Sequence, residues 1–160
     1  MTTELETVLH FLRYIGIETN FCTLDASRCF LPGLLIEGGR ILIDLEKLLY
    51  AGDLLHEAGH VAVVPEAERV TLDGPTIGSR KDAAAEEMMA IAWSYAACVH
   101  LTIAPSFVFH EAGYRGGGAE IARNFKEGNY FGVPLLQWLG MTGRTEDDAR
   151  YPAMVKWLRG

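Results

Sequence analysis

The residues best placed to do chemistry in this sequence form the run His56-Glu57-Ala58-Gly59-His60. In an α-helix, positions four apart lie one above the other on one face, so His56 and His60 could offer two imidazole nitrogens to one metal ion. Glu57 lies about 100° around the helix from His56. Its carboxylate could therefore stand beside the ion without ligating it and take a proton from metal-bound water. This HExxH pattern predicts a metal centre with a catalytic base.

Two histidines leave the predicted centre incomplete, because a catalytic zinc ion usually takes three protein ligands and keeps its fourth position for water. No histidine lies between His60 and His100, so we expect a carboxylate on the next helix as the third ligand. Glu86 and Glu87 are the candidates, with Asp82 nearby. Adjacent helical residues point about 100° apart, so only one of the pair should face the motif helix. Both candidates sit in apolar stripes, and periodicity leaves the choice open.

The motif and the segment after it resemble the ImmA/IrrE-type zincin metallopeptidases. In that family HExxH is followed by a ligand glutamate, by an alanine three residues later and commonly by an aromatic residue three residues after that. Glu87, Ala90 and Trp93 fit this register, whereas Glu86 would place Met89 at the alanine position. The resemblance, which also includes the hairpin before the motif helix, covers roughly residues 34–101.

The resemblance implies a zinc-dependent, peptidase-like hydrolase. His56, His60 and Glu87 would hold one Zn²⁺ ion, and Glu57 would activate its water to attack an amide carbonyl. A peptide or protein is the implied substrate. The sequence departs from the family at Ile91, where relatives usually carry Asn or Asp. A non-catalytic metal-binding protein with a regulatory or partner-binding role on the same scaffold is therefore the alternative interpretation.

Two further kinds of metal site use similar ligands. Two imidazoles and a carboxylate could also hold non-haem iron for oxygen chemistry, although such sites normally use the loops and strands of a barrel, and few strands are visible in this sequence. A structural metal site would need a fourth protein ligand, and chelation would then unfold the protein.

A later run, His110-Glu111-Ala112-Gly113-Tyr114, repeats the letters HEAG but ends in tyrosine, so it is not a second HExxH motif. Zincins often stabilise the reacting oxyanion with a Tyr, His or Arg from a later segment. His110, Tyr114 and Arg115 are therefore candidates for oxyanion or substrate contacts. The alternative is that each is an ordinary loop residue.

The elements that must position these residues are mainly helices. Apolar spacing predicts a helix from Thr3 to about Tyr14, a motif helix from an Asp53 N-cap to before Pro65, and a long helix from Arg80 to about Leu101. The long helix is expected to start with a capping box formed by Ser79 and Asp82. The remaining expectations are strands over 34–37 and 40–44 around a Gly-Gly hairpin turn, loops over 16–32 and 66–79, a helical turn over 45–50, a helix over 119–126 and terminal helices from Pro134 and Pro152.

At the level of the whole chain, 160 residues predict one domain, residues 1–160, with an α+β fold: a zincin-like minimal core of several helices packed on a small sheet with a β-hairpin. A net charge of −7 disfavours nucleic acid as a partner. No apolar run is long enough to span a membrane, and the N-terminus lacks the basic region of a signal peptide. The three cysteines form no CxxC pair, which favours a reducing cytoplasm. No particular oligomeric state is predicted.

Overall fold

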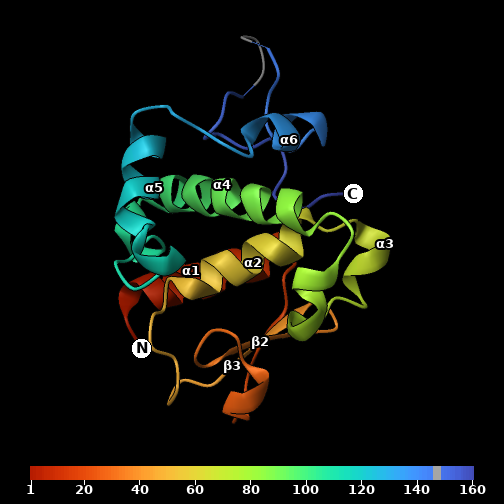
Figure 1. The fold of residues 1–160 in the computed structure, drawn as a ribbon, viewed down its shortest axis with the longest axis vertical. Helices are drawn as coiled ribbons and strands as arrows, with labels where there is room; N and C mark the ends of the chain where they lie inside the picture. Colours follow the sequence, from red (N-terminus) through yellow and green to blue (C-terminus); the bar gives the residue numbers. More distant parts are fainter. Residues whose placement is uncertain (146–148) are drawn as a thin grey trace.

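A computed structural model describes residues 1–145 and 149–160. Helices are stacked above a small sheet, with α2 and α4 lying side by side through the middle of the molecule (Figure 1). The prediction of an α+β fold with a β-hairpin is therefore confirmed. The α-helices of the described residues are α1 (Thr3–Ile15), α2 (Asp53–Val63), α3 (Glu66–Arg69), α4 (Ala83–Leu101), α5 (Gly118–Lys126) and α6 (Val133–Trp138).

The sheet in the described part of the chain has three strands in the order β1-β3-β2. Strands β2 (Leu34–Glu37) and β3 (Arg40–Ile43) form the predicted antiparallel hairpin. Gly38 and Gly39 make its turn with φ values of +60° and +75°, a conformation that glycine adopts without a steric penalty.

The loop predicted over 16–32 is wrong in part, because β1 (Thr19–Phe21) pairs in parallel with β3 there. The strand is short and mostly exposed, so it leaves no hydrophobic alternation in the sequence. Its existence depends on a partner about twenty residues away rather than on its own residue types. A 3₁₀ turn, η1 (Ala26–Arg28), follows in the same segment.

The predicted loop over 66–79 contains α3 and a 3₁₀ segment, η2 (Gly74–Ser79). The predicted capping box does not form, because α4 begins after Asp82 without a side-chain cap and the Ser79 hydroxyl donates to the Thr76 carbonyl at 2.9 Å. The first helix is confirmed with Thr2 as its cap, since the Thr2 hydroxyl accepts from the Leu5 amide. The helices predicted over 119–126 and from Pro134 correspond to α5 and α6.

The terminal helix predicted from Pro152 is wrong. The segment after residue 149 runs back along the body of the protein and makes its hydrogen bonds with distant residues. The Val155 amide donates to the Met141 carbonyl, the Arg159 amide donates to the Ala62 carbonyl, and the Trp157 carbonyl accepts from the Trp93 indole N–H at 2.9 Å. These long-range partners replace the local hydrogen bonds that a helix would have made.

Helix α4 lies at the centre of the core, and its middle section is buried on all sides. Helix α2 packs on one flank of α4, α6 lies on the other (Figure 1), and Trp93 at the centre of α4 is fully buried. A helix that is apolar all round carries no directional stripe. This explains why periodicity could not select the face that meets α2.

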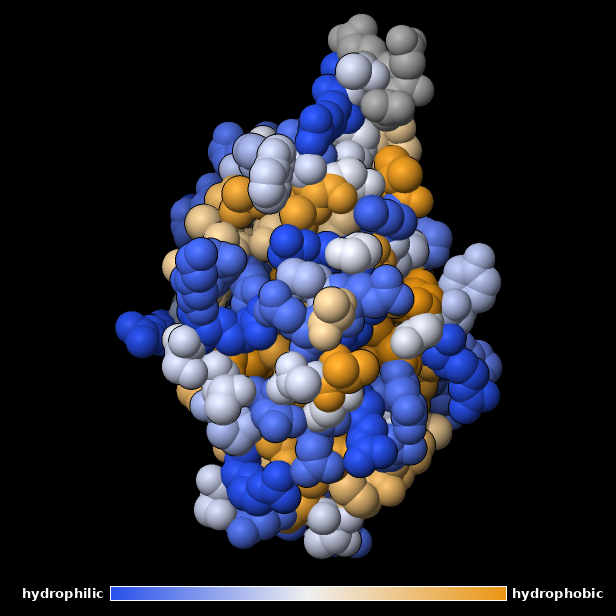
Figure 2. All heavy atoms as spheres, turned by 90° about the vertical axis from the view of Figure 1, so that its right-hand side faces the viewer, coloured by the Kyte–Doolittle hydropathy of each residue, from blue (hydrophilic) through white to orange (hydrophobic). Residues whose placement is uncertain are grey.

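The face over α3 presents many hydrophilic side chains, with smaller apolar patches between them (Figure 2). Within the described residues, no helix combines the length and the apolar character needed to cross a membrane. Cys22, Cys29 and Cys98 are free thiols.

Candidate metal centre

Helix α2 carries the HExxH residues and starts one residue earlier than predicted. Gly52 is the N-cap, and Asp53 is the first helical residue, so the predicted capping role of Asp53 is wrong. The Asp53 carboxylate instead contacts Nε2 of His110 at 2.7 Å. A capping residue accepts hydrogen bonds from the free amides of its own helix. The Asp53 carboxylate instead pairs with His110, which is 57 residues away in the sequence.

The two histidines of α2 converge with Glu87 of α4. Nε2 of His56 lies 3.1 Å from Nε2 of His60. The Glu87 carboxylate places one oxygen 3.0 Å from Nε2 of His60 and the other 3.6 Å from Nε2 of His56. Ligand atoms bound at 2.0–2.2 Å in a tetrahedral zinc site are roughly 3.3–3.6 Å apart. The three groups therefore lie close to the spacing that one zinc ion would require.

Glu57 completes a second grouping, because one ligand atom from each of His56, Glu57 and His60 lies within 4.8 Å of the others. The two groupings share both histidines and differ in the carboxylate. Glu87 comes within 3.6 Å of both imidazoles and reaches them from a separate helix. We therefore regard Glu87 as the better third ligand and Glu57 as the carboxylate beside the site.

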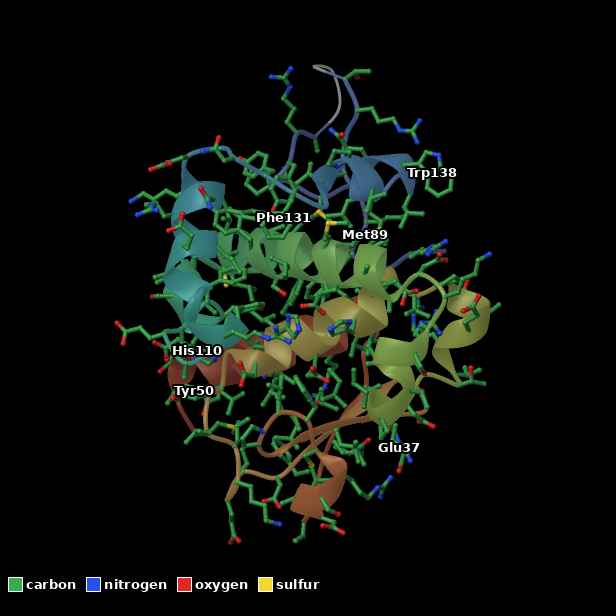
Figure 3. The ribbon with its side chains drawn as sticks, in the orientation of Figure 1. Glu37, Tyr50, Met89, His110, Phe131 and Trp138 are labelled. Atoms are coloured by element: carbon green, nitrogen blue, oxygen red, sulfur yellow. The ribbon has the colours of Figure 1, made fainter. Side chains whose placement is uncertain are left out.

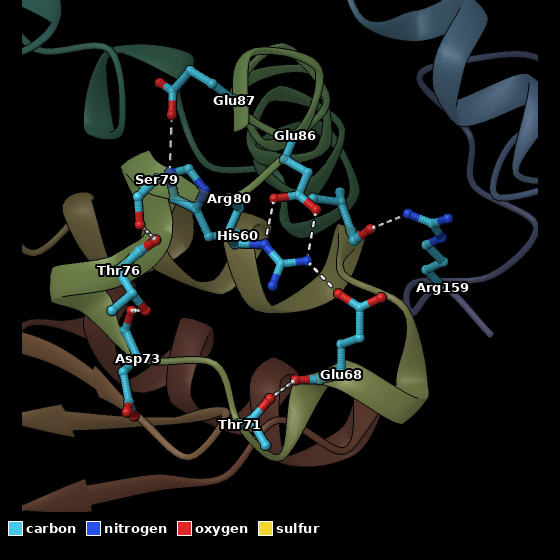
Figure 4. Close-up of polar contacts among 11 residues, drawn as sticks. His60, Glu68, Thr71, Asp73, Thr76, Ser79, Arg80, Glu86, Glu87 and Arg159 are labelled. Carbon is cyan, nitrogen blue, oxygen red and sulfur yellow. Dashed lines mark hydrogen bonds and ion pairs between the residues drawn. The ribbon is translucent and has the colours of Figure 1, made fainter. Parts of the chain in front are cut away.

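Glu86 is engaged elsewhere. Its side chain is 3% exposed and accepts hydrogen bonds of 2.8 Å and 3.0 Å from the guanidinium of Arg80. Arg80 also contacts Glu68 at 2.8 Å, and Figure 4 shows the guanidinium held between the two carboxylates while Glu87 points toward His60. Asp82, the third carboxylate considered, is exposed before the first turn of α4. Of the two adjacent glutamates, Glu87 therefore faces the histidines, and Glu86 is held by its ion pair with Arg80.

The close approach of α2 and α4 brings the ligands together. A Cβ atom added to Gly59 would lie 2.8 Å from the Ala90 carbonyl oxygen and 3.2 Å from the Ala90 Cβ. Two small residues therefore face each other where the helices cross. A larger side chain at either position would separate the histidines from Glu87.

Burial and neighbouring charges set the protonation of the site. Burial, together with His60, lowers the pKa of His56 to about 4. Burial raises the pKa of Glu57 to about 7. Burial is the largest single influence on His60 and Glu87, but their mutual hydrogen bond and the neighbouring charges together outweigh it, so the pKa of His60 is raised and that of Glu87 is lowered. In the metal-free protein His56 is thus held neutral, as a metal ligand must be, and the Glu57 carboxyl keeps its proton to a higher pH than an exposed carboxyl does.

The three candidates from the later segment, His110, Tyr114 and Arg115, lie around the same site. The Tyr114 hydroxyl is 3.0 Å from Nδ1 of His56, and burial raises the pKa of this phenol well above its usual range. His110 stacks on Tyr50 with ring centroids 3.9 Å apart, and Figure 3 shows the pair near the start of α2. Arg115 is exposed on the wall of the neighbouring cavity. The sequence pointed to this segment but not to its partners Asp53 and Tyr50.

Ile91, the departure from the family pattern, is buried at 7% exposure in the apolar core. An apolar side chain offers no hydrogen bond to a ligand carboxylate. The position that carries a polar residue in the family pattern described above therefore contributes packing here.

Two cavities meet at the site. One, of about 610 Å³, is lined largely by aromatic and aliphatic side chains together with Asp53, His110, Tyr114 and Arg115. The other, of about 650 Å³, lies over β2 and η2 and includes Glu57 and His60 in its wall. Phe30, His56 and Glu87 line both cavities, and Phe30 is 96% exposed between them. Both cavities therefore adjoin the candidate site.

Comparison of this chain with protein-family models, with curated proteins and with solved structures gives no match. What the site can do is therefore inferred from the geometry of the residues themselves. The strongest part of that geometry is the convergence of α2 and α4 on one small group of nitrogen and oxygen atoms.

Proposed function

We propose that this protein is a zinc-dependent metallohydrolase of the peptidase-like kind. His56, His60 and Glu87 would hold the ion, and Glu57 would act as general base. The observation that carries the proposal is the grouping of two imidazole nitrogens and a carboxylate within 3.6 Å of one another, contributed by two helices. The similarity of the sequence to ImmA/IrrE-type zincins points in the same direction.

The donor set favours zinc among the common metals. Zinc accepts imidazole and carboxylate ligands in tetrahedral geometry, and a set of three protein ligands is the usual arrangement of its hydrolytic sites. When bound, zinc lowers the pKa of water and polarises a carbonyl group. A purely structural site would require a fourth protein ligand.

Glu57 supports hydrolysis because a carboxylate oxygen of this residue lies within 4.8 Å of ring nitrogens of both His56 and His60. Its carboxylate would accept a proton from the attacking water and pass it to the nitrogen of the leaving amine. Because Glu57 comes one residue after His56 on α2, it keeps the position beside the ligands that this role requires.

The two cavities support an extended substrate rather than a small molecule. Both have His56 and Glu87 in their walls, so a chain that occupied both cavities would pass the site. A peptide backbone presents a carbonyl group at every residue and fits such a path. We therefore propose a peptide or protein substrate, hydrolysed at an amide bond.

The proposal is tested by a Glu57→Gln variant. We expect one zinc ion per chain in both proteins, measured by elemental analysis, and a loss of turnover on the order of 10²–10⁴-fold in the variant. The exposed Glu66, changed to Gln, is the matched control and should keep full activity. Full activity in Glu57→Gln would refute the role given to this carboxylate, and protein that takes up no zinc would refute the site.

A second candidate function is a non-catalytic metal-binding regulator or partner-binding module. The buried Ile91 favours it, because that position provides no polar support for the ligands. This function predicts stoichiometric zinc together with no turnover on broad libraries of peptides and amides. Zinc-dependent cleavage of any member would exclude it.

We also propose that the protein works in a reducing compartment such as the cytoplasm. Its cysteines are all free, and Cys22 is exposed. An oxidising compartment favours disulfide formation by such thiols.

A further inference from the structure

His56 makes polar contacts through both ring nitrogens. Nε2 faces His60 and Glu87, and Nδ1 lies 3.0 Å from the Tyr114 hydroxyl. We propose that Tyr114 is a positioning residue of the metal centre, which sets the tautomer and the ring orientation of His56 so that Nε2 is presented to the ion. This inference rests on the metal site of the proposed function, but it does not depend on hydrolysis.

The chemistry of the imidazole ring assigns the direction of the hydrogen bond. A neutral imidazole carries one proton, and the nitrogen that binds a metal must offer its lone pair. If Nε2 binds the ion, the proton is on Nδ1 and donates to the Tyr114 oxygen. A partner of this kind on the outer nitrogen holds a ligand ring in place and raises its basicity.

The phenol ring is itself fixed. It meets the His56 ring edge-on, with centroids 5.4 Å apart and an interplanar angle of 89°, and packs against the buried Phe109 at 5.4 Å. A side chain packed on both sides cannot swing away from Nδ1 without losing these contacts. The hydroxyl is therefore a preset partner rather than a mobile one.

The backbone that carries Tyr114 adopts an unusual conformation. Tyr114 and Arg115 both have φ of +56°, in the left-handed region that residues other than glycine rarely adopt. Such a conformation persists only where the surroundings hold it, and it is concentrated at functional sites. Here it directs the Tyr114 side chain at α2.

An anchor four residues earlier holds the segment. Nε2 of His110 contacts the Asp53 carboxylate at 2.7 Å, and its ring stacks on Tyr50 (Figure 3). Asp53 and His56 are three residues apart and so lie on one face of α2. The segment 110–115 therefore contacts α2 at two points on that face, one through His110 and one through Tyr114. The ligand His56 is held by the second of them.

The test compares Tyr114→Phe with the unchanged protein. The substitution removes only the hydroxyl and keeps the packed ring. We expect the zinc dissociation constant, measured by competition with a chromophoric chelator, to rise by about 10–100-fold. We also expect the visible spectrum of the cobalt-substituted protein to change, because the orientation of one ligand ring is no longer fixed.

Tyr151→Phe is the matched control. The Tyr151 hydroxyl also makes a partly buried hydrogen bond, of 2.7 Å to the Ala92 carbonyl, but Tyr151 is outside the site. Its loss should affect unfolding and leave zinc affinity and the cobalt spectrum unchanged. As a second measurement, His110→Ala should weaken zinc binding when it is the only substitution and weaken it much less when combined with Tyr114→Phe. The two substitutions are not additive because both act through the contact of Tyr114 with His56.

A rise in the dissociation constant for Tyr114→Phe and not for Tyr151→Phe supports the inference. An unchanged constant and cobalt spectrum in Tyr114→Phe overturn it. Zinc bound normally without any hydrolysis overturns the proposed enzymatic activity alone. If the unchanged protein binds neither zinc nor cobalt, both the site and the role of Tyr114 fall.

Discussion

Glu57 shows at the scale of one residue how a buried carboxylate can oppose stability. Burial raises its pKa from the ordinary 4.5 to about 7. The folded protein then holds this proton more tightly than the unfolded chain does, so this residue's contribution to stability is lost as the pH rises from about 4.5 to 7. We expect metal-free Glu57→Gln to match the parent near pH 4.5 and to exceed its free energy of unfolding by about 3 kcal/mol at pH 7. Urea unfolding at the two pH values measures the difference, and equal stability at pH 7 would contradict the raised pKa.

The residues of the candidate site differ in how far the sequence alone could predict them. His56, Glu57 and His60 are adjacent in the sequence, and one helical turn is enough to group them. Glu87 could not be distinguished from Glu86 by sequence, because the difference between them depends on Arg80. Arg80 follows η2 and pairs with Glu86 where η2 packs against α4. The sequence predicts Asp53 as a helix cap, which is wrong, because its partner His110 is remote in the sequence and no local pattern reveals it.

At the scale of elements, the crossing of α2 and α4 is the feature that the site depends on. We predict that Gly59→Ala lowers the free energy of unfolding by about 1–3 kcal/mol, because the added methyl group would meet Ala90 at 2.8–3.2 Å. This loss would outweigh the gain of up to ~1 kcal/mol in helix propensity. Zinc affinity should fall as well, since the ligands are on both helices. Chemical denaturation and zinc titration measure the two effects. Gly78→Ala, where an added Cβ meets nothing within 4 Å, is the control.

The elements that the sequence predicted well are those with strong local signals. Helix α1 has an apolar stripe and a capping threonine, and the hairpin has two glycines at its turn. Strand β1 and the segment after Pro152 depend on distant partners, β3 and Met141 among them, and neither carries a local pattern that reveals this. Local propensity is a weak guide wherever tertiary pairing decides the conformation.

At the scale of the whole molecule, the C-terminal segment ties α1, α2 and α4 together. Trp157 packs edge-on against Phe11 and Trp93, with centroids 4.9 Å and 5.5 Å away. We predict that Trp157→Ala lowers the free energy of unfolding by about 2 kcal/mol, since it removes a large, partly buried ring. Thermal or urea unfolding measures this loss. Trp138→Ala removes the same side chain from a site that is 72% exposed and should change stability little. Comparable losses in the two variants would refute the tethering role of the segment.

The contact of Gly59 with Ala90 also has a consequence for evolution. The two positions are 31 residues apart in the chain, yet a Cβ atom at position 59 would lie 2.8 Å from the Ala90 backbone oxygen and 3.2 Å from the Ala90 Cβ. In any diverged chain with the same arrangement, no change of side chain at position 90 would remove the contact with the backbone oxygen, so a residue larger than glycine at position 59 would move the helices apart and carry Glu87 away from the histidines. We therefore expect glycine at position 59 in diverged chains that keep the candidate site, and a set of such sequences should reveal this before any of their structures is determined.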